Sequence, residues 1–342
     1  MTVIDRPIIN FAAMNNVLHR FTLPLLAACF LWSSCEKKEQ PYPLPPRGEA
    51  QSIQFDLGSD YATQVFFSFT KGVVSSGSYK SWDLAFSNNT DQAEFWMNGP
   101  KPILVYATGE TEFAAVLSAA NIPDSAWKYD DPSGLPGTSA LGNISDNAIL
   151  HQVIIVKISN QYYKLKIQDI TNTYYVIETA EMTSETGRTD TLSVDSDYNF
   201  SYFSFTDGIV KPEPPKADWD LVFTRYRYIY RHYNDDGSDF LYNVSGALLN
   251  PYQTTGAADS SFRQSFEELN REKVEAMELM PNRDVIGFDW KTVNINTGEY
   301  TVVPEMLFVV KDQNGTWWKF HFTGYYNDKG EKGSPRIEFM QL

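Results

Sequence analysis

One short pattern occurs twice in this chain, as Trp82-Asp83-Leu84-Ala85-Phe86 and again as Trp219-Asp220-Leu221-Val222-Phe223. In an extended strand, successive side chains lie on opposite faces, so Trp, Leu and Phe share one face and Asp takes the other. A strand that is apolar on one face is typical of a sheet that covers a core. We therefore expect two core strands, whose tryptophans pack inside the protein rather than against a ligand.

The sequence upstream of each pattern is repeated as well. The repeated pieces are SDY at 59–61 and FFSFTKG at 66–72, then SDY at 196–198 and YFSFTDG at 202–208. Matches that recur in the same order, at a nearly constant separation, indicate an internal duplication. We predict one half over residues 51–190 and a second over residues 191–342.

Most of the body has the pattern of short strands. Residues 162–167 and 225–231 alternate between two faces, and 153–158 and 306–310 are apolar runs of strand length. Glycine-containing turn pairs occur between such segments, namely Asp236-Gly237, Asn314-Gly315 and Lys329-Gly330.

One helix is predicted in each half. The first is expected near residues 110–120, before Asn121 and Pro123. The second is expected after a capping box formed by Ser261 and Gln264, with Phe262, Phe266 and Leu269 at helical spacing and Pro281 at its end. The predicted fold is mainly β, with two related antiparallel β-rich halves that each carry one short helix.

Composition excludes several functions. The formal net charge is −15, and an acidic surface repels phosphate backbones, so nucleic-acid binding is not expected. The two cysteines, Cys29 and Cys35, lie near the N-terminus, which leaves the body without a thiol nucleophile or a cysteine metal site. No phosphate-binding loop, zinc-protease motif or serine nucleophile elbow occurs, so we expect a binding protein rather than an enzyme.

Residues 1–34 are predicted to be an export signal. Arg20 precedes an apolar stretch that is shorter than the roughly 20 residues needed to span a bilayer. Small residues then lead to Cys35, as in a bacterial lipoprotein signal, so Cys35 is the predicted lipidated residue. Cys29, preceded by Leu-Ala-Ala, is the alternative, and an anchor helix retained in the membrane is another.

Residues 35–50 are predicted to be a Pro-rich tether between an acyl anchor and the folded body. Met14 is an alternative start of the chain.

The segment that follows the second core strand stands out, because arginines and tyrosines alternate in it. On a strand, Tyr226, Tyr228 and Tyr230 share one face, and Arg225, Arg227 and Arg231 lie on the other. Arginine binds carboxylates and tyrosine offers a flat amphipathic ring, which suits a planar anionic ligand. The alternative is an edge strand whose arginines are solvated and oppose aggregation.

Three side chains near this segment could bind a metal ion or a haem iron. His232 ends the Arg/Tyr segment, and Met277 and Met280 lie three apart in the second predicted helix. The alternatives are a surface histidine and methionines that pack under a sheet. Residues 235–239 (DDGSD) could offer oxygens to calcium, but a polar hairpin turn is the preferred interpretation.

Over most of the body, roughly residues 51–342 and most strongly from residue 195 onward, the order of motifs resembles the HmuY-like lipoprotein family of Bacteroidetes-type bacteria, in a longer duplicated branch. The matching stretches are 217–224 (ADWDLVFT), 244–250 (VSGALLN), 286–291 (IGFDWK) and the ending 325–333. The resemblance implies a β-rich, lipid-anchored haem scavenger that holds the iron with two axial histidines or methionines and works beside an outer-membrane transporter.

On this resemblance, His232, Met280 and Met277 are axial candidates, Arg225, Arg227 and Arg231 are candidates for the haem propionates, and Tyr226, Tyr228 and Tyr230 are candidates for aromatic contact. The predicted function is haem or porphyrin binding at the outer membrane in a lipid-anchored protein, with exposure on the cell surface as one arrangement. The alternative is a surface lipoprotein that binds a glycan or an outer-membrane transporter without haem.

Overall fold

A computed structural model describes residues 48–146, 148–261 and 263–342. The predicted signal, Cys35 and nearly all of the tether lie outside these residues, as does Phe262 of the second predicted helix. Within the described ranges, no helix is long and apolar enough to cross a membrane.

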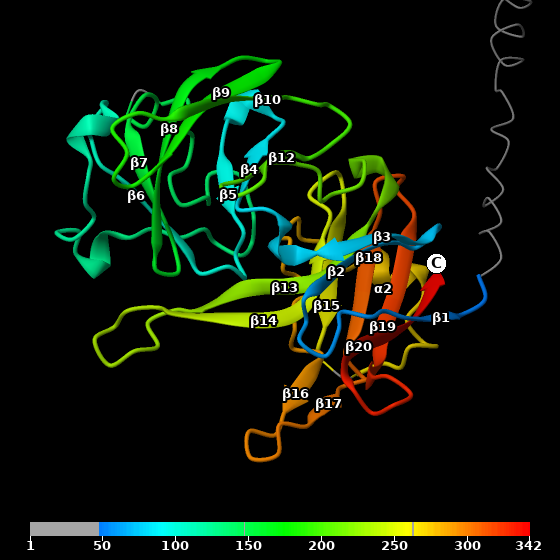
Figure 1. Ribbon diagram of the computed structural model, residues 1–342. Helices are drawn as coiled ribbons and strands as arrows, with labels where there is room; N and C mark the ends of the chain where they lie inside the picture. The colour runs from blue at the N-terminus through cyan, green and yellow to red at the C-terminus, as the bar shows by residue number, and fades with distance from the viewer. Residues whose placement is uncertain (1–47, 147, 262) are drawn as a thin grey trace, which may run out of the picture. The chain divides into compact units, whose positions relative to one another are not determined.

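The described residues form antiparallel β-sheets (Figure 1), which confirms the predicted mainly β fold. One five-stranded sheet has the order β1 (Gln51–Gln54), β20 (Lys332–Gln341), β19 (Trp317–Tyr326), β18 (Leu307–Lys311) and β15 (Thr255–Asp259). The other has the order β10 (Arg188–Ser193), β9 (Tyr174–Glu181), β8 (Gln161–Ile170), β7 (Val153–Ile158) and β6 (Ile103–Ala107). A small hairpin pairs β16 (Lys291–Val293) with β17 (Tyr300–Val302).

Two four-stranded sheets join segments that are distant in sequence. The first has the order β14 (Phe240–Leu249), β13 (Leu221–Tyr230), β2 (Thr63–Ser68) and β3 (Gly72–Ser78). The second has the order β12 (Gly208–Val210), β11 (Phe200–Ser204), β4 (Leu84–Ser87) and β5 (Phe95–Met97). Strand pairing therefore crosses the predicted division at residue 190 in both directions.

The two crossings have the same register. Leu221 lies opposite Phe67, and Leu84 lies opposite Phe203. Phe67 is fully buried in the core of the β18–β20 sheet, and Phe203 is fully buried in the core of the β6–β10 sheet. Each repeated hairpin thus supplies a buried phenylalanine to the core beside the other Trp-Asp-Leu strand.

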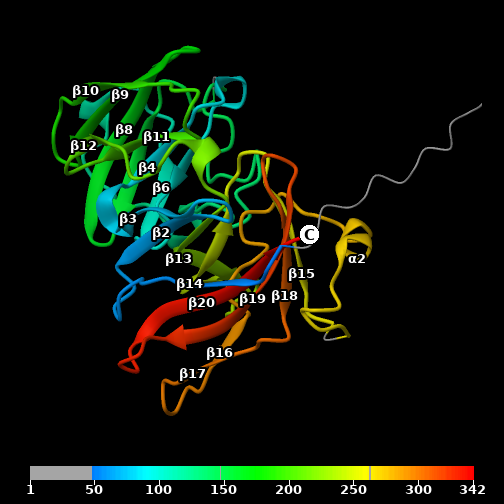
Figure 2. The same cartoon turned by 90° about the vertical axis from the view of Figure 1, so that its right-hand side faces the viewer.

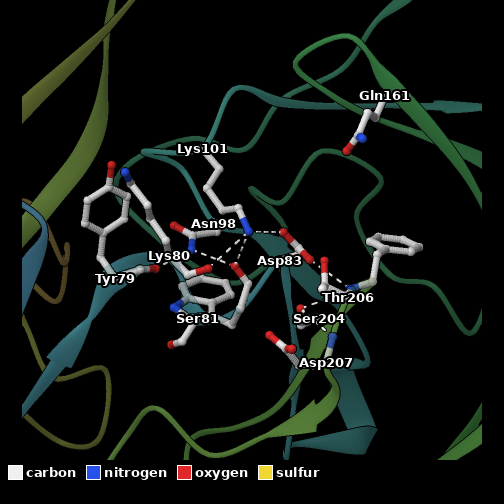
Figure 3. A network of polar contacts seen from close by, with 12 residues as sticks. Tyr79, Lys80, Ser81, Asp83, Asn98, Lys101, Gln161, Ser204, Thr206 and Asp207 are labelled. Carbon is white, nitrogen blue, oxygen red and sulfur yellow. Dashed lines mark hydrogen bonds and ion pairs between the residues drawn. The ribbon is translucent and has the colours of Figure 1, made fainter.

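The aspartates of the two patterns make matching hydrogen bonds. Asp83 accepts the Phe205 N–H at Oδ2 over 2.8 Å, and Asp220 accepts the Phe69 N–H at Oδ2 over the same distance. Asp83 also pairs with the Lys101 ammonium, which donates to the carbonyls of Lys80 and Trp82 as well (Figure 3). Each buried carboxylate thus links its Trp-Asp-Leu strand to the repeated hairpin of the other half, with which that strand pairs.

Both helix predictions were wrong in extent. Residues 110–120 contain only a 3₁₀ turn at Phe113–Ala115, and the second segment forms only α2 (Arg271–Glu275), seen in Figure 2. Instead of completing the predicted capping box, the Gln264 amide donates to Asp259.

A different buried lysine accounts for the shortened or missing helix in each segment. Lys164 donates to the carbonyls of Phe113 and Val116, and Lys319 donates to those of Phe266 and Leu269. A backbone carbonyl that accepts a hydrogen bond from a lysine ammonium points toward that side chain, and not toward the N–H four residues later as in a regular helix. Both segments are therefore loops wrapped around a lysine.

Candidate functional site

The Arg/Tyr segment lies on a strand that outruns its neighbour. β2 pairs only with Leu221–Phe223, whereas β14 pairs with the whole of β13 as far as Tyr230. Figure 1 shows β13 and β14 continuing together beyond β2 as a two-stranded hairpin. The predicted site residues are thus divided between a covered end and a free end of one strand.

A group of aromatic side chains, here called the tip cluster, gathers at the free end. Its members are Tyr228, Tyr230, Tyr233, Phe240, Tyr242 and Phe288. Ring centroids are 5.0 Å apart for Tyr228–Phe288 and 5.5 Å apart for Tyr233–Phe240. Tyr233 is 67% exposed, Tyr242 49% and Phe240 39%. A contiguous exposed group of aromatic rings is a common sign of a binding surface.

His232 lies in the turn between β13 and β14, beside Tyr233. Its backbone has a positive φ of 53° and its N–H donates to Asp239 Oδ1 over 2.9 Å. The ring Nδ1 lies 3.1 Å from the Gly237 carbonyl, an arrangement in which Nδ1 carries the proton. Nε2 has no hydrogen-bond partner among the described residues. A histidine whose Nδ1–H is held by a carbonyl presents its Nε2 lone pair to a metal ion.

Residues 235–239 form a polar hairpin turn, which was the preferred interpretation of this stretch. Asp239 accepts from Arg231 and from the Tyr129 hydroxyl, and Asp236 accepts from Ser238. The His232 backbone N–H, and then Arg231, lower the pKa of Asp239 to about 2. Across the described residues, no group of three or more His, Cys, Asp or Glu side chains is arranged to hold a metal ion.

The three arginines have different environments. Arg231 bridges Asp131 and Asp239, each at 2.6 Å. Arg227 is buried and donates to the carbonyls of Ile103 and Lys101. Arg225 is half-buried and makes neither a hydrogen bond nor an ion pair with any described residue through its guanidinium. The guanidinium of Arg225 is therefore the one most available to an anion.

Arg225 lies far along β13 from the exposed end of the tip cluster. At about 3.3 Å per residue, five residues of strand separate Arg225 from Tyr230 by roughly 17 Å. Tyr226, between them, is buried against Phe288 and does not present its ring to solvent. The predicted residues thus fall into two places rather than one.

Both methionine candidates pair or pack with elements other than the turn that carries His232. Met280 pairs through its backbone with Gly256 of β15 and is 41% exposed, and Met277 packs against a small core beneath β18. Both lie outside α2, so the helix predicted to carry them does not reach them.

The other end of β13 lines a cavity of about 130 Å³, here called the seam cavity. It lies between the two sheets that join distant segments, and Trp82 and Trp219 of the repeated pattern both line it. Further lining residues include several aromatic or charged ones, among them Phe66, Tyr79, Trp96, Tyr202, Asp130 and Arg225. Trp219 packs against Phe66, as expected of a core tryptophan, whereas Trp82 is only half-buried.

Several residues of these two places were not predicted from the sequence. Tyr233, Phe240 and Tyr242 surround the turn, and their alternation across it was the available signal. Phe288 joins the tip cluster from a loop far along the chain, and no local pattern marks it.

Residues 196–339 match the family described as HmuY protein, which confirms the resemblance seen in the sequence for this part of the chain. No curated protein matches the sequence. Several solved structures are similar to it at low identity, three of them as follows. The apo HmuY analog of Tannerella forsythia is 12% identical, with 87% of this chain and 99% of that chain covered and a TM-score of 0.29.

The other two structures are similarly distant. Apo PinO, described as from Porphyromonas gingivitis, is 10% identical over 86% of this chain and 98% of its own, with a TM-score of 0.26. A protein from Bacteroides vulgatus, described as HmuY-like and haem-binding, is 16% identical over 85% and 90%, with a TM-score of 0.21.

Proposed function

We propose that this protein binds a planar anionic ligand of the porphyrin class, haem foremost, on the tip cluster. The observation that carries the proposal is the open Nε2 of His232 beside a cluster of exposed aromatic rings. The match to HmuY, a family of binding proteins, supports it. A bound haem supplies an iron centre that accepts an imidazole nitrogen as axial ligand.

The residues present fit one axial ligand. His232 offers its Nε2, while the tip cluster offers apolar ring surface for a macrocycle. Met277 and Met280 belong to other elements, so they are not assigned here. Arg231 is already held by two aspartates, so it is a weaker candidate for a propionate than the sequence alone indicated.

Size argues against the seam cavity as the porphyrin site. Pockets that enclose drug-sized ligands measure about 300–1,000 Å³. The seam cavity measures about 130 Å³, which is too small to enclose a tetrapyrrole. The open tip cluster has no such limit.

The test is a haemin titration of the purified protein, followed in the Soret and visible bands in both redox states. We expect a saturable one-to-one shift that is lost in His232→Ala. His151→Ala is the matched control, because His151 is also exposed and also has a positive φ. It is expected to leave the shift unchanged.

Ring contact is tested separately with metal-free protoporphyrin, whose binding does not use an axial ligand. Tyr242→Ser is expected to weaken it about 3- to 10-fold, since one aromatic contact contributes about 0.5–1.5 kcal/mol. His232→Ala should leave it unchanged. Absence of a Soret shift in both redox states would overturn the proposal, and a sugar-dependent change in Trp fluorescence would then favour the glycan alternative.

We also propose that the protein acts at the cell envelope, anchored through acyl chains on Cys35 and beside an outer-membrane transporter. The sequence around Cys35 supports the anchor. Cys35→Ser is expected to abolish lipid labelling and release the protein from the membrane fraction, while Cys29→Ser should not. The reverse result would assign the anchor to Cys29.

A further inference from the structure

The seam cavity holds polar groups that the fold does not satisfy. Gln64 on β2 lines it, is only 6% exposed, and its amide makes no hydrogen bond with any described residue. The amide atoms keep some solvent access, so water can satisfy them when no other molecule is bound. Such a group is expected where a bound molecule or ordered water completes the structure.

Arg225 is the second unsatisfied group. It lines the same cavity, and its guanidinium lies 6.0 Å from the ring centre of Tyr79, another lining residue. A half-buried guanidinium without a carboxylate or carbonyl partner favours an anionic ligand, because it binds carboxylates through two parallel N–H donors.

The other charged groups along the cavity are already compensated. Arg227 donates to two carbonyls, and Asp131 pairs with Arg231. Asp130 accepts the N–H groups of Met97 and Ala140, although burial raises its pKa to about 7. Arg283 is half-buried and has a nearby carboxylate in Glu213. The charge available for a ligand is therefore that of Arg225.

Volume sets the size of that ligand. An apolar protein cavity of about 150 Å³ accommodates one benzene molecule. The seam cavity, at about 130 Å³ and walled by Trp82, Tyr79 and Phe66, is of that size. Its walls and its charge together suit one aromatic ring that carries an acidic group.

We propose that the seam cavity binds a single-ring aromatic carboxylate. The ring lies among the aromatic walls, the carboxylate meets the Arg225 guanidinium, and the Gln64 amide supplies a further hydrogen bond. This site is separate from the tip cluster and does not depend on the porphyrin proposal.

The test measures binding of phenylacetate to the purified protein by saturation-transfer NMR and by Trp fluorescence. We expect saturable binding, and at least about 10-fold weaker binding of benzyl alcohol, which keeps the ring but lacks the charge. Cyclohexanecarboxylate, which keeps the charge but lacks the aromatic ring, tests the walls and is expected to bind more weakly than phenylacetate. Saturating haemin should not displace phenylacetate.

Variants then locate the site. Arg225→Gln is expected to weaken phenylacetate binding at least about 10-fold and to leave benzyl alcohol binding unchanged. Arg263→Gln, at an exposed arginine outside the seam cavity, is the matched control. Thermal unfolding of each variant shows whether it has folded.

Three results would overturn the proposal. They are no saturable binding of phenylacetate to the wild-type protein, equal binding of phenylacetate and benzyl alcohol, and displacement of phenylacetate by haemin, which would place the acid on the tip cluster. All three use the wild-type protein, so they decide the matter even if Arg225→Gln does not fold.

Discussion

The hairpins that follow the two Trp-Asp-Leu patterns begin alike and end differently. Each starts from a strand tied to a distant hairpin by a buried aspartate. β4 and β5 then stop after four and three residues, whereas β13 and β14 each continue for ten. The extra length carries the tip cluster and His232. The shared frame sets strand register, and the extension beyond it exposes the aromatic rings on which we propose that a ligand binds.

The two aspartates differ in one respect within this shared frame. Asp83 has the Lys101 ammonium as an ion-pair partner, whereas Asp220 has no ion pair among the described residues. Burial raises the pKa of Asp220 to about 6, partly opposed by the Phe69 N–H. Asp83 and Asp220 thus accept the same kind of backbone hydrogen bond but differ in their charged partners.

The largest expected effect comes from separating the halves. Residues 48–190 and 191–342, expressed alone, should each lack cooperative unfolding, because β13 loses β2 and β4 loses β11. Mixing the two fragments should restore a cooperative transition in urea, followed by circular dichroism. A fragment that unfolds cooperatively by itself would show that the crossed pairings are dispensable.

Removing each aspartate should sharpen the comparison. Asp83→Ala leaves the Phe205 N–H without its acceptor and the Lys101 ammonium without its carboxylate, and we expect a loss of about 3–5 kcal/mol. Asp220→Ala leaves the Phe69 N–H without its acceptor and breaks no ion pair, for an expected loss of about 1–3 kcal/mol. Urea unfolding measures both, and equal losses would indicate that Lys101 contributes nothing.

A further difference is the pH dependence that Asp220 contributes. Its folded pKa of about 6 lies above the ordinary 3.8, so the folded protein holds the proton more tightly than the unfolded chain does. The free energy of unfolding should therefore fall as pH rises from about 4 to about 6. The fall is about 2 kcal/mol over this range, and about 3 kcal/mol from well below pH 4 to well above pH 6, at about 1.4 kcal/mol per pKa unit.

Asp220→Asn keeps an acceptor for Phe69 but cannot titrate, so the difference between wild type and variant isolates this contribution from other carboxyls. Urea midpoints at several pH values measure it. Parallel curves for wild type and variant would contradict the raised pKa.

The strands were predictable because their signals are local. Residues 153–158 form β7 as expected, and the alternation over 225–231 corresponds to β13. The Asp-Gly turn at 236–237 has the positive φ at Gly237 that such a turn requires. The crossing of the two hairpins was not predictable, since a repeated motif pairs equally well with its own copy or with the other one.

The helix predictions were wrong because the lysines that bind the backbone carbonyls of these segments are distant in sequence. Lys164 and Lys319 alternate with aromatic residues and resemble solvent-facing lysines, yet both are almost fully buried. Each reaches carbonyls about fifty residues away in sequence. No pattern within residues 110–120 or 261–280 reveals that partner.

The candidate site was predicted in composition and not in arrangement. The Arg/Tyr alternation located the right strand, but Arg231 and Arg227 are engaged by groups far along the chain. The spacing of Arg225 from His232 follows from strand geometry and could have separated the two places beforehand.

The pairing of the first strand with the last sets when this protein can finish folding. Gln51 lies opposite Phe339, and β2 pairs with the much later β13. The earliest strands therefore emerge during synthesis without their partners. Such distant pairings slow folding and leave strand edges open meanwhile. The sheets are therefore complete only once Lys332–Gln341 is available, and until their partner strands arrive the open edges of β1 and β2 can pair with another chain.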